Sequence, residues 1–190
     1  MRCTDAVMKR LFRRPLTRVA AVILVFAVGA GLYWFQPWKL VADRAVDETL
    51  AVLPAPASVP APAGSRSVAP SRPAVVRQGE FISHEHDTSG VARVIRHPDG
   101  SYALELVGLD TSNGPDLRVW LSDQPVRAGA QGWRVFDDGV WAELGRLKGN
   151  KGDQSYAIPA GTDLDRLDSV AIWCKRFAVS FGAAGLAPTA

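Results

Sequence analysis

A long apolar run near the N-terminus limits most strictly what this chain can fold into. From Val19 to Phe35 the sequence contains no charged residue. Together with Leu16 and Thr17, the run is about long enough for a helix that crosses a bilayer. Aromatic residues lie at its end, where the aromatic belt of a membrane helix belongs: Tyr33, Trp34 and Trp38. We therefore expect a transmembrane anchor over residues 19–38.

The charges around this run predict its orientation. The first 18 residues hold six Lys and Arg against one Asp, and the first charge after the run is Lys39. By the positive-inside rule, residues 1–18 form a cytoplasmic basic N-terminus and the rest of the chain is exported. We expect a single-pass cell-membrane protein whose C-terminal domain is periplasmic or extracellular. A cleavable signal peptide is the alternative, because Val28 and Ala30 provide small residues before a cut.

A Pro- and Ala-rich segment follows the expected span. Residues 41–50 form a polar piece that is compatible with a helix, and six prolines then occur between Leu53 and Pro73. Prolines at this spacing favour an extended, semi-rigid chain over a packed core. We interpret residues 39–78 as a linker that acts as a stalk, with recognition of its Pro-rich sequence by a partner as the alternative.

After Gly79, short apolar runs alternate with turn residues, which indicates a β domain. Residues 97–100 (His-Pro-Asp-Gly) have the composition of a hairpin loop. We predict an all-β domain over residues 79–187, an antiparallel β-sandwich or flattened barrel of about eight short strands. The predicted strands cover residues 91–96, 101–107, 117–121, 133–136, 143–147, 154–158, 170–174 and 178–181.

The charge and the motifs of this domain exclude several functions. From Gly79 to the end the chain has 11 Lys and Arg against 15 Asp and Glu, a net charge of −4. We therefore expect no nucleic-acid partner, because a nucleic-acid-binding domain carries a basic patch. The domain contains no Gly-rich phosphate loop after a strand, no G-x-S-x-G elbow, no H-E-x-x-H and no CxxC pair.

Cys174 is the candidate catalytic residue. The chain has one other cysteine, Cys3, and the expected topology places the two on opposite sides of the membrane. Exported proteins usually pair their cysteines, so a single thiol outside suggests a function. Val170, Ile172 and Cys174 share one face of a strand, so the thiol is expected on a core-facing row, at the last position before a bend. A buried, inert side chain is the alternative.

Two histidines are candidate metal ligands. His84 and His86, at positions i and i+2, would share one face of a strand and could bind a metal or a haem iron through their imidazoles. The alternative is that both are solvent-facing polar residues on an edge strand.

Three blocks of the domain, in order, resemble a known family. They are NGPDLRVWL at residues 113–121, LGRLKGNKGDQSYAIP at residues 144–159, and SVAIWCKRFAVSFG at residues 169–182. They are similar to the successive signatures of the DM thirteen family, the Skeletor-type electron-transfer domain that also occurs in bacterial membrane-anchored proteins. The resemblance covers about residues 79–187 and includes His86, which a Ser-Gly turn follows as in the family.

The resemblance implies a redox role for Cys174. It implies that Cys174 and His86 bind a cofactor, with haem and copper as candidates, or that the naked thiol itself reacts. Lys175 and Arg176 would lower the pKa of the thiol if their charges lay close to it. The family also implies a redox partner protein, whereas the oligomeric state is not predicted.

We therefore expect a membrane-tethered, extracytoplasmic electron-transfer or thiol-redox module centred on Cys174, rather than a stand-alone enzyme. The alternative is a non-catalytic binding or adhesion module at the cell surface with a structural cysteine. In that case Trp120, Trp133 or Trp141 would line a ligand face. The membrane is an expected partner under both hypotheses.

Overall fold

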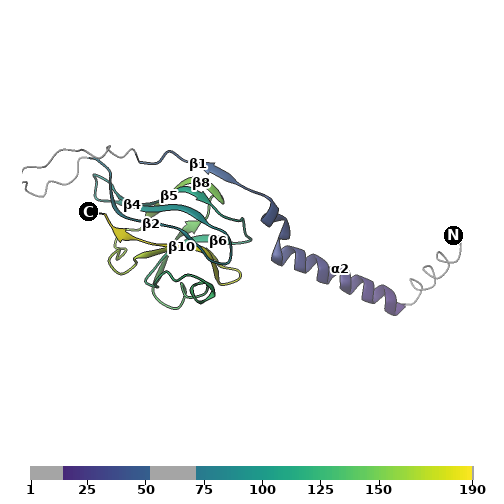
Figure 1. Ribbon diagram of the computed structural model, residues 1–190. Helices are drawn as coiled ribbons and strands as arrows, with labels where there is room; N and C mark the ends of the chain where they lie inside the picture. Colours follow the sequence, from purple (N-terminus) through teal and green to yellow (C-terminus); the bar gives the residue numbers. More distant parts are fainter. Residues whose placement is uncertain (1–14, 52–71, 190) are drawn as a thin grey trace, which may run out of the picture. The chain divides into compact units, whose positions relative to one another are not determined.

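The structure, a computed structural model, describes residues 15–51 and 72–189. The chain divides into two units, Met1–Trp38 and Lys39–Ala190. Figure 1 shows the helix of the first unit and the sheets of the second. The basic N-terminus up to residue 14, and residues 52–71 of the Pro- and Ala-rich linker, lie outside the described residues.

The described part of the first unit is one helix, α2 (Pro15–Phe35), and the short helix η1 (Pro37–Val41) follows it. The 21 residues of α2 include none that is buried. At the usual rise per residue they extend over about 32 Å, close to the thickness of a bilayer's hydrocarbon core. The segment Pro15–Lys39 is long and apolar enough to cross a membrane. A membrane anchor and a signal sequence both have such a helix.

Eleven strands lie in the described part of the second unit. They are β1 (Ala45–Asp47), β2 (Ala74–Glu80), β3 (Ile82–Ser83), β4 (Ser89–Arg96), β5 (Tyr102–Asp110), β6 (Leu117–Ser122), β7 (Trp141–Arg146), β8 (Lys151–Ile158), β9 (Ser169–Cys174), β10 (Val179–Gly185) and β11 (Ala187–Pro188). One sheet has the order β1-β8-β5-β4-β2-β11 and the other β3-β10-β9-β6-β7. Paired strands are antiparallel except β1 and β8.

The two sheets enclose one main core, and Figure 1 shows them as two layers. Both layers contribute fully buried aliphatic side chains: Val94, Leu104 and Leu106 from the first sheet, and Val119, Val170 and Ile172 from the second. Burial of each such side chain stabilises the fold by about 1.5–3 kcal/mol. The predicted all-β sandwich after an apolar helix is confirmed.

Strand β9 has neighbouring strands on both edges and an apolar cluster on each face. Val170, Ile172 and Cys174 face the main core, as the alternation of the strand predicts. Ala171 and Trp173 face a second apolar cluster on the other side of the same sheet. This position between two clusters explains why all six residues of β9 are buried.

A tight turn at residues 175–178 joins β9 to β10, which confirms the predicted bend. Ala178 adopts a left-handed conformation there, with φ of 49°. Val179 and Phe181 then face the main core. A register shift between Ser180 and Gly182 reverses the alternation, so that Ala183 joins the second cluster.

The prediction of a strand at residues 133–136 is wrong. This segment belongs to the connection between β6 and β7, which contains the short helix η2 (Ala130–Gly132). Phe136 is fully buried in the second cluster, and Trp133 packs against the main core. The two aromatic residues therefore anchor this loop to the domain, and three of the four residues at 133–136 are apolar, as in a short strand.

Two strands lie in segments where we expected linker. Strand β1 pairs in parallel with β8, although residues 41–50 seemed compatible with a helix. Strand β2 pairs with β4 over its whole length, and Val76 packs against the main core. The alternation of β2 is obscured by the register shift between Val75 and Arg77, which explains why a period-two pattern did not reveal it.

Candidate functional site

Cys174 is the free cysteine of the described residues and is fully buried. It is the last residue of β9, opposite Leu117 of β6 and Val179 of β10. Side chains of the main core enclose the thiol. No part of its surface is open to solvent in the folded chain.

Two opposing influences set the proton affinity of the thiol. Burial raises the pKa of Cys174 above its ordinary value, and backbone hydrogen bonds of Phe177, Arg176 and Asp116 act against this. The carboxylate of Asp116 adds to the effect of burial. The pKa is raised overall, so the charges of Lys175 and Arg176 do not bring it below its ordinary value. At neutral pH the sulfur is a thiol.

His84 is held inside the fold and is 7% exposed. Its Nδ1 lies 2.9 Å from Ser180 Oγ, and its Nε2 lies 3.1 Å from the carbonyl oxygen of Arg127. Because a carbonyl oxygen only accepts, this contact assigns the proton of the neutral ring to Nε2. Burial lowers the pKa of His84, and the hydrogen bond to Arg127 acts against it. Both ring nitrogens are used, so neither is available to a metal.

His86 is half-buried and packs on an aromatic ring. Its centroid lies 3.9 Å from that of Phe181, with an angle of 35° between the rings. Its backbone N–H donates to the carbonyl oxygen of Phe181, 3.4 Å away. The expectation that His84 and His86 share one strand face is wrong, because β3 ends at Ser83 and both histidines lie in the bend that follows.

The described residues do not form a haem or copper site at Cys174. Across residues 15–51 and 72–189, no three His, Cys, Asp or Glu residues lie together in a way that could hold a metal ion. The Cys174 sulfur is closed in by core side chains, and His84 is fully hydrogen-bonded. The enclosed sulfur therefore favours the thiol itself over a cofactor held by Cys174 and His86.

A row of aromatic rings leads from the surface to β9. Trp141, which is 40% exposed, stacks on Trp120 with centroids 4.0 Å apart and an angle of 2°. Trp120 in turn stacks on Trp173 at 5.2 Å, and Trp173 contacts the edge of Phe136 at 6.3 Å. Trp173 directly precedes Cys174 in the chain. From the sequence, Trp120 and Trp141 are expected only to line a ligand face, because their stacking depends on the pairing of β6 with β7.

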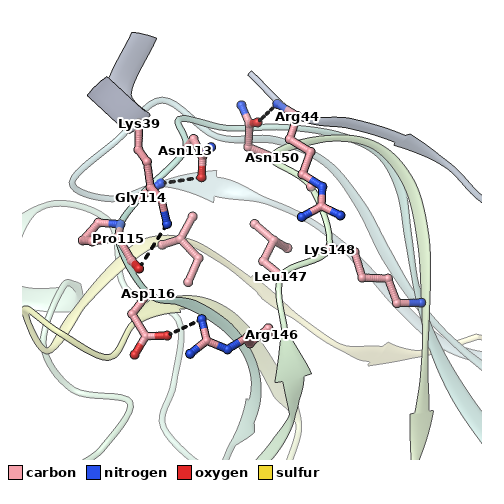
Figure 2. Close-up of a pocket in the computed structure, with 12 residues that line it drawn as sticks. Lys39, Arg44, Asn113, Gly114, Pro115, Asp116, Arg146, Leu147, Lys148 and Asn150 are labelled. Atoms are coloured by element: carbon pink, nitrogen blue, oxygen red, sulfur yellow. Dashed lines mark hydrogen bonds and ion pairs between the residues drawn. The ribbon is translucent and has the colours of Figure 1, made fainter. Parts of the chain in front are cut away.

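A basic cavity of about 410 Å³ adjoins the strand that faces Cys174. The loop at residues 113–117, the loop at residues 146–150, Lys39 and Arg44 line it. Figure 2 shows Lys39 and Arg44 extending toward the space between the two loops, and Arg146 turned toward Asp116. Sequence reasoning missed this cavity, because its basic residues are about a hundred positions apart in the chain.

A comparison with known families decides the affiliation of this domain. The family described as "Electron transfer DM13" matches residues 80–186, more than half of the chain. The chain belongs to the DM13 family. No curated protein and no solved structure matches it.

The DM13 match contains every predicted site residue: His84, His86 and Cys174. Membership in this family indicates a general role in electron transfer, as the three sequence blocks predicted. The match also contains the aromatic row, and the two loops of the basic cavity lie within it.

Proposed function

We propose that this DM13 protein is a membrane-tethered electron-transfer module with its β domain outside the cytoplasm and Cys174 as its redox centre. The proposed organisation is a cytoplasmic N-terminus at residues 1–18, an anchor at 19–38, a connecting segment at 39–78 whose strands β1 and β2 join the first sheet, and the DM13 domain at 79–187. A redox partner protein that carries one electron at a time exchanges electrons with the domain.

The environment of the Cys174 sulfur carries this proposal. Backbone hydrogen bonds of Phe177, Arg176 and Asp116 lower the pKa of a thiol that core side chains otherwise enclose. Hydrogen bonds to sulfur are a means by which proteins tune the potential of a sulfur centre. An inert cysteine that only fills the core needs no such donors.

Burial favours electron transfer over exchange chemistry at this thiol. Disulfide exchange and oxidation to a sulfenic acid both require contact between the sulfur and a reagent. Electron transfer requires no contact, because an electron crosses short distances through packed protein. In the proposed step the oxidised partner takes one electron from Cys174, the thiol proton passes to water during a brief local opening of the core, and a neutral sulfur radical remains. Both states of the sulfur are uncharged, as a buried site prefers.

The aromatic row supports a route for this electron. Electronic coupling falls steeply with distance, and the ring centroids of Trp141, Trp120 and Trp173 are separated by 4.0 and 5.2 Å. Trp141 is the exposed end of the row. A partner that contacts Trp141 would therefore reach β9 through stacked rings.

The apolar helix supports the tether. Segment Pro15–Lys39 has the length and composition of a membrane span, and the six basic residues among the first 18 favour a cytoplasmic N-terminus. The apolar run also continues through Leu32 to Phe35, past the small residues at which a signal peptide would be cut.

Voltammetry of the full chain tests the redox centre. The protein is purified in an uncharged detergent and carries Cys3→Ser, so that Cys174 is the remaining thiol. We expect a one-electron signal whose potential falls by about 59 mV per pH unit, because one proton leaves with each electron. Cys174→Ala should abolish this signal while circular dichroism shows an unchanged fold.

Val179→Ala is the matched control for Cys174→Ala. Val179 lies opposite Cys174 in the sheet and is also fully buried, so its truncation leaves a comparable cavity but keeps the thiol. This control should retain the signal. A signal that persists in Cys174→Ala would contradict the proposal and leave Cys174 as a packing residue.

A further inference from the structure

The basic cavity is an exception in an acidic domain. Residues 79–190 carry a net charge of −4, whereas the cavity is lined by four basic residues and a single acidic one: Lys39, Arg44, Arg146, Lys148 and Asp116. Like charges repel one another when they converge on a small space. This arrangement therefore needs compensation from within the fold or from a ligand.

The fold compensates only part of this charge. The Lys148 ammonium lies 2.8 Å from both carboxylate oxygens of Glu48 and 2.7 Å from the carbonyl oxygen of Ser155. Asp116 accepts a 2.8 Å hydrogen bond from Arg118, and its contact with Arg146 is longer, at 3.4 Å. Glu48 thus neutralises Lys148. Asp116 pairs mainly with Arg118, which does not line the cavity.

Three cations keep unused hydrogen-bond donors. Within the part of the chain that the structure describes, no acceptor pairs with the Arg44 guanidinium. The Arg146 side chain is 69% exposed and has only its 3.4 Å contact with Asp116. Lys39 donates to the carbonyl oxygen of Pro115 at 3.4 Å, near the outer limit for a hydrogen bond.

The backbone of Arg44 is held firmly in place. Its N–H donates to Asn150 Oδ1 at 2.7 Å, and its carbonyl oxygen accepts from the N–H of Lys151 at 3.4 Å. A Cβ at Gly149 would collide with the same carbonyl oxygen, so glycine is required for this close approach. With the backbone already fixed, only the Arg44 side chain has to be ordered when it binds a ligand.

We propose that this cavity binds an organic phosphate. The guanidinium groups of Arg44 and Arg146 would donate paired hydrogen bonds to the phosphate oxygens, and Lys39 would add a point charge. The apolar side chains of Leu117 and Leu147, which also line the cavity, would contact the organic part. A volume of about 410 Å³ falls within the usual range of small-molecule sites.

A phosphate group of this kind has two sources, a soluble ester and a phospholipid headgroup. Lys39 follows the end of the apolar helix at Phe35 by four residues in the sequence, which is the reason to test a lipid. The proposal does not depend on Cys174, and Cys174→Ala should bind the phosphate as the wild type does.

Isothermal titration calorimetry of the full chain in an uncharged detergent tests the proposal. The two titrants are glycerol 3-phosphate and dihexanoyl phosphatidylglycerol, a short-chain soluble lipid. We expect saturable binding of at least one titrant, which weakens as the ionic strength rises. The double variant Arg44→Gln with Arg146→Gln should weaken that binding by about tenfold or more.

The double variant Arg96→Gln with Arg127→Gln is the matched control. It also removes two positive charges, but from residues that do not line the cavity. It should therefore bind each titrant as the wild type does. Tighter binding of the soluble ester would identify a free phosphate as the ligand, and tighter binding of the lipid would identify a headgroup. Absence of binding to both titrants, or equal weakening in both double variants, would overturn the proposal.

Discussion

At the scale of single residues, the burial of Cys174 disfavours direct reaction of its thiol with small molecules and permits electron transfer. The side chain is fully buried and its pKa is raised, so the reactive thiolate is disfavoured in the folded chain. A naked thiol that reacts directly with small molecules is therefore a poor description of this site. Electron transfer through the surrounding protein is compatible with the same burial.

Thiol labelling distinguishes these two descriptions. In the full chain with Cys3→Ser, we expect a maleimide to modify Cys174 at least about a hundred times more slowly in buffer than in denaturant, because modification must await opening of the core. The rates follow from mass spectrometry of timed samples. Rapid labelling of the native protein would show that the sulfur is accessible, and the thiol-redox description would then replace electron transfer.

His84 should make the stability of the fold depend on pH. Burial lowers its pKa in the folded state, so the unfolded chain binds the proton more tightly. The stabilisation is complete above the unfolded pKa of about 6.5 and is lost as the pH falls below it toward the folded pKa. Ser180, the carbonyl oxygen of Arg127 and the ring of Phe136 surround the imidazole.

Urea unfolding at pH 7.5, 6.5 and 5.5 measures this dependence. We expect the wild type to lose stability between pH 6.5 and 5.5, and His84→Gln to be less stable at pH 7.5 but flatter over this interval. His97→Gln, in the hairpin loop after β4, is the control and should follow the wild type. A wild-type curve as flat as that of His84→Gln would contradict the assignment.

Trp141 offers a test of the proposed electron route. Trp141→Leu removes the exposed ring that stacks on Trp120, and we expect it to slow electron exchange with an electrode or a partner by about tenfold while the potential stays the same. Val140→Ala changes a neighbouring residue of similar exposure and should have no effect. Voltammetric rate constants provide the comparison, and equal rates in both variants would exclude a route through Trp141.

At the scale of secondary structure elements, β2 determines where the domain begins. It pairs with β4 from Ala74 to Glu80 and with β11 at Arg77 and Gln78. A fragment of residues 79–190 lacks most of this strand and leaves β4 at an open edge. We expect a fragment of residues 72–190 to be more stable by about 3 kcal/mol or more, because it keeps Val76, which packs against the main core, and the ladder hydrogen bonds.

Thermal melting of both fragments, followed by circular dichroism, tests the role of β2. The longer fragment should melt cooperatively, and the shorter one should melt at a lower temperature or remain unfolded. Equal melting temperatures would mean that β2 is dispensable and that the domain begins at Gly79.

The sequence predicts an element well where its alternation is regular. Strand β9 is buried in the predicted orientation, and the hairpin between β4 and β5 turns at Gly100, whose φ is 84°. Prediction failed at β2, where a register shift interrupts the period. It also failed at residues 133–136, because a loop packs apolar side chains, buried Phe136 and partly buried Trp133, against the domain. In both cases tertiary packing, rather than local pattern, decides the structure.

At the scale of the whole molecule, the site residues that the sequence could not predict are those that only the topology brings together. The orientation of Cys174 follows from parity along one strand. In contrast, the ring of His84 is held by Ser180 and Arg127, and Arg44 meets Arg146 at the cavity. Such contacts join residues tens of positions apart, and no local pattern records them.

The orientation of the whole chain in the membrane can be tested directly. The basic residues before the apolar helix predict that the N-terminus is cytoplasmic and that everything after about residue 39 is exported. A reporter that matures only in the cytoplasm, fused after Ala190, should be silent, and the same reporter placed before Met1 should be active. Replacing the six basic residues of the first 18 with Gln should weaken this preference, because these residues supply the charge difference across the span. An active reporter at Ala190 in the unmodified chain would place the DM13 domain in the cytoplasm. Unpaired cysteines are common in that compartment, so the single thiol of Cys174 would then no longer indicate a function.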